Sequence, residues 1–487
     1  MGIAPGATLA CRFAGLGLLG SLAACASLAP SEQAPLAKLD MPVAWSRGTA
    51  AASAAAGGSA VSTASLLAWW QRFDDAQLDA LEGQALQANT TVQGARAALG
   101  QARALRDLAA AALWPNLTAQ ASAQRGTVGG RSSGNNFQLG ADASWALDLF
   151  GARRAALEAG EAGLAASQAS LGDVQVQIAA EVALNYILLR TSQVRSLIAA
   201  ENLASQEETL QITLWRQQAG LVTALEAEQA RAAVEQSRAL LPLLQTSSGQ
   251  TLHALAVLTG RPPAALLEMA ELGAVSSALK VPQAREALTL NIPAETLRQR
   301  ADVRAAEYQV AAALAREAQA QAQRYPSFAI GGSLGWSAAT VGALGNSNAV
   351  LGSLLASVSL PLFDGGALSA QLRVQQAALT QAQLLYRAAV LAALQQVEDA
   401  LLALQGARLR LASLRLAADA ASSAAQLARQ RYSSGLIDFQ TVLETQRTQF
   451  ATQDGVASAS AEVGSDQVRL FKALGGGWSP AVEAPNR

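Results

Sequence analysis

The sequence predicts an α+β membrane protein in which long α-helical hairpins are joined to four β-strands of a transmembrane β-barrel. Three observations favour this fold class. A series of short sequence motifs occurs twice along the chain in the same order, and the two copies are offset by roughly 210–215 residues. Each copy holds two segments of about 10–12 residues in which apolar and polar side chains alternate. Each copy also holds very long Ala-rich stretches, and Ala is the residue that most favours a helix.

The composition argues against most enzymes and against nucleic-acid binding. The 487 residues carry 35 Lys and Arg against 36 Asp and Glu, so the net charge of −1 provides no attraction to nucleic acid. Aromatic residues make up only 5%, which is low for a thick globular core. The chain has one His, His253, and two Cys, both close to the N-terminus. We therefore expect no catalytic residues, no metal site and no cofactor.

The N-terminus has the features of an export signal followed by a lipid-attachment site. The apolar run Phe13–Ala24 is too short to span a bilayer, which takes roughly 20 residues. It ends in Leu-Ala-Ala before Cys25, a pattern that resembles the lipobox of bacterial lipoproteins. The resemblance implies a signal peptide over 1–24, acylation of Cys25 and, because Ala26 follows, placement in the outer membrane. An ordinary signal peptide with an incidental Cys is the alternative. Residues 25–64 are expected to form an extended tether.

The remainder of the chain divides into two structural repeats, residues 65–275 and 276–474, followed by a flexible tail over 475–487. The sequence NTTVQGARAALGQA begins the pattern at Asn89, and RADVRAAEYQVAAALA begins it again at Arg300. In each repeat we expect a helix, a pair of strands, a very long helix, a Gly-containing break and a second long helix.

Strands are predicted at about 116–125 and 136–148 in the first repeat, and at about 327–337 and 350–362 in the second. Every run is close in length to a tilted strand that crosses an outer membrane, which takes roughly 9–11 residues. Alternation of apolar and polar residues alone fits soluble hairpins with one buried face equally well. The expected lipid anchor favours strands that cross the membrane. The apolar residues predicted to share one face of the last strand are Leu354, Ala356, Val358, Leu360 and Leu362.

Four strands cannot close a barrel within one chain. Open strand edges in hydrocarbon leave backbone groups without hydrogen-bond partners, at a cost of several kcal/mol each. Transmembrane strands therefore require several copies of the chain, and a trimer gives about 12 strands, which lies within the range known for such barrels.

Two features predict unusually long helices. No Pro occurs between Gly151 and Gly220, so one helix of roughly 65–70 residues would extend about 100 Å. Apolar residues also recur at a spacing of seven, which is typical of helices that pack as in a coiled coil. An isolated coiled coil is the alternative, although it would not need the strands. The residues at this spacing are Leu157, Leu164, Leu171 and Ile178 in the first repeat, and Leu372, Leu379 and Tyr386 in the second.

Short motifs in a fixed order carry a resemblance to a known family. They are WWQRF from Trp69, WALDLFG ending at Gly151, LTGRP ending at Pro262, LFDGG ending at Gly366 and TVLETQR ending at Arg447. Together they resemble the TolC-like outer membrane factor family, in its NodT- or OprM-type lipoprotein branch of RND efflux systems. The resemblance implies a homotrimer with a twelve-stranded β-barrel in the outer membrane and a long periplasmic α-barrel.

The resemblance also implies a function. The channel would passively conduct substrates from an inner-membrane transporter of the RND type, coupled through a periplasmic adaptor protein, to the exterior. An exit duct for type I protein secretion or for metal-ion efflux is the alternative within the channel class. A non-conducting structural coiled-coil lipoprotein is the alternative outside it. The family usually has Pro at the position of Ala301, directly before Asp302. That Pro helps to set the start of a helix, so the sequence does not fix the residue at which the helix near 300 begins.

Two turns between long helices are the first candidate sites, Gly220-Leu221 and Gly435-Leu436. Gly permits the left-handed backbone that such turns require. By resemblance these turns lie at the periplasmic tip and dock the adaptor, and a plain turn without a partner is the alternative.

Acidic residues that follow these turns are the second candidate site. By resemblance, acids near this end of the last long helix narrow the pore. A ring of carboxylates there would favour cations and raise its own pKa by mutual repulsion. A solvated helix face is the alternative. The candidates are Glu226 and Glu228 in the first repeat, and Asp438 and Glu444 in the second.

Overall fold

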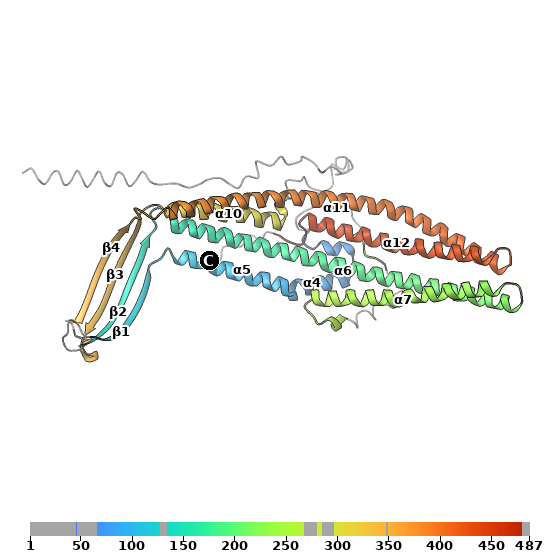
Figure 1. Ribbon diagram of the computed structural model, residues 1–487, viewed down its shortest axis with the longest axis horizontal. Coiled ribbons are helices and arrows are strands. Elements are labelled where there is room, and N and C mark those ends of the chain that lie inside the picture. Colours follow the sequence, from blue (N-terminus) through green and yellow to red (C-terminus); the bar gives the residue numbers. More distant parts are fainter. Residues whose placement is uncertain are drawn as a thin grey trace, which may run out of the picture. The chain divides into compact units, whose positions relative to one another are not determined.

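The same series of elements occurs twice along the chain (Figure 1). The first series is α5 (Thr90–Ala111), β1 (Asn116–Gly126), β2 (Gly134–Leu147), α6 (Ala152–Gln218) and α7 (Ala224–Leu258). The second is α10 (Ala301–Ala322), β3 (Ser327–Ala338), β4 (Val350–Ser359), α11 (Ala367–Ser433) and α12 (Phe439–Ala473). Matching helices have equal lengths, which are 22 residues for α5 and α10, 67 for α6 and α11, and 35 for α7 and α12. The expected duplication and the very long helices are confirmed.

Shorter elements complete the part of the chain that this computed structural model describes, which is Trp45 and residues 66–126, 134–266, 280–284, 297–346 and 349–479. All of these belong to one unit, Asp40–Arg487. Cys25, the expected signal peptide and the tether apart from Trp45 lie outside the described residues. The shorter elements are η3 (Trp69–Phe73), α4 (Ala76–Ala88), η4 (Pro263–Leu266) and η5 (Val341–Ala343).

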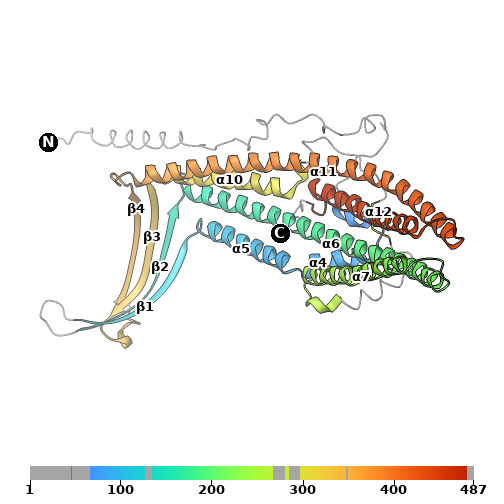
Figure 2. The ribbon, with the colours of Figure 1, turned by 45° about the vertical axis from the view of Figure 1, so that its right-hand side comes forward.

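The strands form one antiparallel sheet in the order β1-β2-β3-β4 (Figures 1 and 2). Pairing of β2 with β3 joins the two repeats. Strand β4 ends at Ser359, so the prediction of a strand to residue 362 is wrong at its end. The reason is Pro361, which has no N–H to donate to a neighbouring strand. Leu360 and Leu362 therefore lie beyond the sheet.

Each very long helix begins at a carboxylate that binds its free N–H groups. Asp148 accepts hydrogen bonds from the backbone N–H of Arg153 and of Arg154, at 3.1 and 2.8 Å. Asp364 accepts from Gly366 and Leu368 in the corresponding place, at 2.8 and 2.7 Å. These bonds satisfy donors that the first turn of a helix leaves without partners.

Helix α6 is central to the packing of the helices. It contacts α5 and α7 of its own repeat and also α10 and α12 of the other repeat. Helix α11 contacts α10 and α12 in the same way as α6 contacts α5 and α7. The two hairpins, α6–α7 and α11–α12, are visible side by side in Figures 1 and 2.

An aromatic cluster joins the beginning and the end of the described chain. Trp69 is fully buried and stacks on Phe471, with 5.3 Å between the ring centroids. The backbone N–H of Gly477 donates to the carbonyl of Leu66 at 2.8 Å. Trp478 fills the space above Gly172 of α6, where a Cβ would lie 2.1 Å from its ring. The prediction of a flexible tail from residue 475 is therefore wrong for residues 475–478, since packing holds them.

Arg300 directly precedes Ala301, the position at which the family usually has Pro. Its buried guanidinium donates to Asp302 at 2.6 Å and to the carbonyl of Ala473 at 2.7 Å. Helix α10 begins directly after it, at Ala301. A buried side chain thus fixes this helix start, and it also ties α10 to the end of α12.

Candidate functional site

The register of the sheet gathers apolar side chains on one face. Directly opposed pairs include Leu139 with Trp336, and Trp145 with Ile330. Successive side chains of a strand point to opposite faces. The odd-numbered residues of β1 and β2 therefore share this face with the even-numbered residues of β3 and β4. The largest apolar members are Leu117, Phe137, Leu139, Trp145, Leu147, Phe328, Ile330, Leu334, Trp336, Val350, Leu354 and Val358.

The opposite face of the sheet is mainly polar and internally hydrogen-bonded. The amide of Gln120 donates to the carboxylate of Asp142 at 2.6 Å. The hydroxyls of Ser333 and Ser353 lie 2.7 Å apart. A sheet that is apolar on one side and polar on the other fits between lipid and water.

Both outer strands have an open edge. Neither β1 nor β4 has a second strand partner among the described residues. Leu354 and Val358 on β4 are also strongly exposed, at 84% and 63%. A sheet of this composition is complete only when further strands pair with both edges.

The two turns between long helices share one geometry. Gly220 and Gly435 have left-handed φ values of 71° and 75°. The N–H of Leu221 donates to the carbonyl of Arg216, and the N–H of Leu436 donates to that of Arg431, at 2.8 and 2.9 Å. Hydrogen bonds of this span define the Schellman ending of a helix. Both leucines project into solvent, with 69% and 74% of their surface exposed.

The candidate acids beyond these turns have different surroundings. Asp438 is the N-cap of α12, and its carboxylate accepts from the backbone N–H of Thr441 at 3.0 Å. Hydrogen bonds from the Thr441 hydroxyl and backbone N–H lower the pKa of Asp438. Glu228 pairs with Arg231 on its own helix at 2.7 Å. Glu226 lies in the first turn of α7, and Glu444 is exposed on α12.

Polar contacts between the two hairpins are a feature that the sequence did not indicate. Near the turns, Arg216 donates to the backbone carbonyl of Tyr432 at 2.7 Å and lies 4.5 Å from the centroid of its ring. Further along, Arg195 of α6 forms two hydrogen bonds with Asp454 of α12, at 2.6 and 3.1 Å. A buried bond of 2.9 Å also joins Gln446 to Thr209. These contacts hold α6 against the α11–α12 hairpin.

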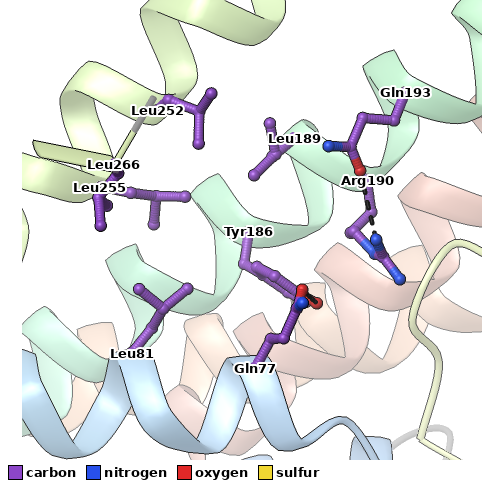
Figure 3. Close-up of a pocket in the computed structure, with 9 residues that line it drawn as sticks. All are labelled: Gln77, Leu81, Tyr186, Leu189, Arg190, Gln193, Leu252, Leu255 and Leu266. Atoms are coloured by element: carbon purple, nitrogen blue, oxygen red, sulfur yellow. Dashed lines mark hydrogen bonds between the residues drawn. The ribbon is translucent and has the colours of Figure 1, made fainter. Parts of the chain in front are cut away.

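A small pocket between α4, α6, α7 and η4 offers no reactive constellation (Figure 3). Its wall is mostly leucine, and Arg190 points to Gln193, with 3.3 Å between donor and acceptor. Tyr186 donates its hydroxyl to Asp75 at 2.7 Å, and burial raises the pKa of this phenol. Within the described residues, no group of His, Cys, Asp and Glu has the arrangement of a metal site.

Known proteins share this architecture. The family described as outer membrane efflux protein matches residues 81–261 and 292–476. The chain is 32% identical over 422 residues to the pyoverdine export outer membrane protein OpmQ of Pseudomonas aeruginosa, covering 84% of this chain and 87% of that protein. It is 29% identical over 429 residues to nodulation protein T of Rhizobium leguminosarum bv. trifolii, covering 86% and 90%.

Solved structures agree with this relationship. The outer-membrane channel OprN superimposes with a TM-score of 0.79 at 35% identity, covering 85% of this chain and 93% of that chain. The outer membrane protein VceC of Vibrio cholerae superimposes with a TM-score of 0.76 at 28% identity, covering 84% and 99%.

A two-faced sheet with open edges, joined to paired helical hairpins, defines the class of membrane-channel subunits. The chain belongs to the outer membrane efflux protein family and is a TolC-like outer membrane factor. It is therefore a subunit of an efflux channel in the outer membrane of Gram-negative bacteria. The predicted family, fold class and channel function are confirmed, and the alternatives of a secretion duct or a structural coiled coil gain no support from these relatives.

Proposed function

We propose that three copies of the chain close into one duct that passively conducts substrates delivered by an inner-membrane transporter of the RND type. One observation carries the proposal. The sheet has a continuous apolar face, and its outer strands β1 and β4 have no further strand partner within the described part of the chain. Pairing of β4 with β1 of the next copy would satisfy both edges and close about 12 strands, a number known among outer-membrane barrels.

The helices supply a second argument for association. By length and composition alone, helix α11 is long and apolar enough to cross a membrane. Apart from Leu385, however, its exposed leucines recur at spacings of seven and eleven, which keep them on one side of the helix. Such a seam is typical of packing against another helix. We assign it to the neighbouring copy. Its members are Leu384, Leu391, Leu402, Leu409, Leu416 and Leu427.

The helical tips are the proposed docking sites for a periplasmic adaptor protein. Gly220 and Gly435 set two similar turns, each of which presents one exposed leucine, Leu221 or Leu436. Exposed apolar residues on rigid turns suit burial in a partner's pocket. Replacing both leucines with Asp should abolish adaptor capture and leave the oligomer intact, whereas retained capture would contradict this assignment.

Carboxylates near the tips are proposed to line the narrowest part of the duct. Glu444 is exposed on α12, and Asp438 caps the same helix. Glu226 and Glu228 occupy the matching part of α7. Three-fold repetition would bring such acids together and favour cations at the aperture.

We also propose that Cys25 is acylated after removal of residues 1–24. Several acyl chains on one residue give a durable anchor, because each buried CH₂ contributes about 0.8 kcal/mol. Mass spectrometry of the mature N-terminus checks this, and an unmodified Cys25 in the mature chain would contradict it.

Purified protein in planar bilayers tests the proposed function. We expect detergent-solubilised trimers that insert and give single-channel conductance. A strain without the gene should also be more susceptible to some members of a panel of drugs, dyes and metal salts. A monomer without conductance, purified intact from the outer membrane, would contradict the proposal.

A further inference from the structure

The polar face of the sheet carries a single ionisable group. Within the four strands, the ionisable residues are Arg125 and Asp142. Arg125 has the odd-numbered position of the apolar face, beside the end of β1. Asp142, in the middle of β2, is therefore the one charged side chain on the face that lines the lumen of a closed barrel.

Asp142 lies in a transverse row of small polar side chains. The register places Thr118, Asp142, Ser333 and Ser353 directly opposite one another across the four strands, and we call them the Asp142 row. The Ser333 and Ser353 hydroxyls bond to each other at 2.7 Å, and Gln120 holds the carboxylate from the adjacent row at 2.6 Å. The carboxylate is thus positioned and remains partly exposed.

The rows on either side leave space around this carboxylate. Gly140 and Gly335 oppose each other in one of them, and Ser144 and Gly331 oppose each other in the other, so the neighbours of Asp142 on β2 and β3 have small side chains or none. The only large apolar residues on the polar face are Leu351 and Leu355 of β4, one in each flanking row. Two strand spacings, about 9.6 Å in all, separate β4 from β2.

We propose that the Asp142 row, repeated around the closed barrel, is a cation-selective ring of the lumen that retains cations with apolar substituents. The carboxylate attracts the charge, and the serine and threonine hydroxyls replace part of its hydration. Leu351 and Leu355 then contact the hydrocarbon groups of the same ion. The inference rests on the proposed closure of the sheet and specifies the class of cargo that the lumen favours.

Reversal potentials of the reconstituted channel in a KCl gradient test the charge. All proteins carry E226Q, E228Q, D438N and E444Q, so that the proposed aperture carboxylates do not set the selectivity, and Asn preserves the N-cap of α12. We expect a cation preference that D142N reduces and that D142N/S333D restores, because Ser333 is the next position of the row. An unchanged reversal potential in a conducting D142N trimer would overturn the proposal.

Block of the channel current by tetraalkylammonium ions tests the contribution of Leu351 and Leu355. The ions are added on the side of the bilayer that faces the β-barrel. Tetrabutylammonium should block at a lower concentration than tetramethylammonium. L351S/L355S should weaken only the tetrabutylammonium block, by about fivefold, whereas D142N should weaken both. Equal sensitivity of L351S/L355S and the parent would overturn the role of the leucines. Failure of the parent to form trimers or conduct would instead contradict the proposed function.

Discussion

Glu82 of α4 is a carboxyl group without exposed surface and without a hydrogen-bond partner among the described residues. Burial, together with the charge of Asp79, raises its pKa well above 4.5. The folded state therefore binds this proton more tightly than the unfolded state does. The resulting stabilisation is complete below pH 4.5 and is lost as the pH rises from there toward the folded-state pKa.

The substitution E82Q removes this titration and gives a prediction at the residue scale. The melting temperature of the parent should fall relative to E82Q as the pH rises above 4.5. The difference in unfolding free energy should grow by at most about 1.4 kcal/mol per pH unit. Thermal unfolding of the detergent-solubilised protein between pH 4.5 and 8 measures it. Parallel curves for the two proteins would show that Glu82 ionises normally.

Single residues were also where sequence reasoning was least informative. Nothing in the sequence distinguishes Glu82 from the exposed acids of other helices. The contacts of Arg216 with Tyr432 and of Arg195 with Asp454 join residues 216 and 259 positions apart. Such pairs depend on how two hairpins pack, and the periodicity of either hairpin alone does not specify them.

At the scale of elements, the sequence was far more informative. Alternation in the strands and the absence of Pro in the long helices are local properties, and both follow directly from backbone geometry. The end of β4 was misplaced because alternation continues through Leu360 and Leu362, although Pro361 interrupts the pairing. Residues 475–478 were misassigned because the notch at Gly172 that receives Trp478 exists only in the folded chain.

Two glycines of α12 give a matched prediction at this scale. A Cβ at Gly464 would lie 2.6 Å from the carbonyl oxygen of Pro282, whereas one at Gly455 would meet only Leu414, at 3.7 Å. G464A should therefore lower the unfolding free energy by about 2 kcal/mol, because the backbone at Pro282 must move. G455A should raise it by up to about 1 kcal/mol through helix propensity.

Thermal unfolding of both glycine variants checks this contrast. The two substitutions add the same methyl group to the same helix, so a difference between them reports the local packing. Equal melting temperatures for G464A and G455A would contradict close packing of residues 280–284 against α12.

At the scale of the whole molecule, association is predicted to depend on the leucine seam of α11. Changing Leu402, Leu409 and Leu416 to Ser should dissociate the trimer, since each exposed leucine contributes apolar surface to the interface. The same three changes to Met should retain it, because Met preserves volume and apolar character. Sedimentation in detergent measures the mass, and circular dichroism checks that the helices remain. Intact trimers of the Ser variant would place the subunit interface elsewhere.

Closure of the sheet by sister copies is the claim on which the other proposals depend, and disulfide cross-linking tests it most directly. In a series of double variants, one cysteine replaces Ser122 of β1 and a second replaces one residue of β4 between Ser353 and Ser357. Oxidation in outer membranes followed by non-reducing electrophoresis should give species of one, two and three chains at one register, with nothing larger. Cross-links confined within single chains, or a ladder that continues beyond three, would contradict a barrel closed by three copies.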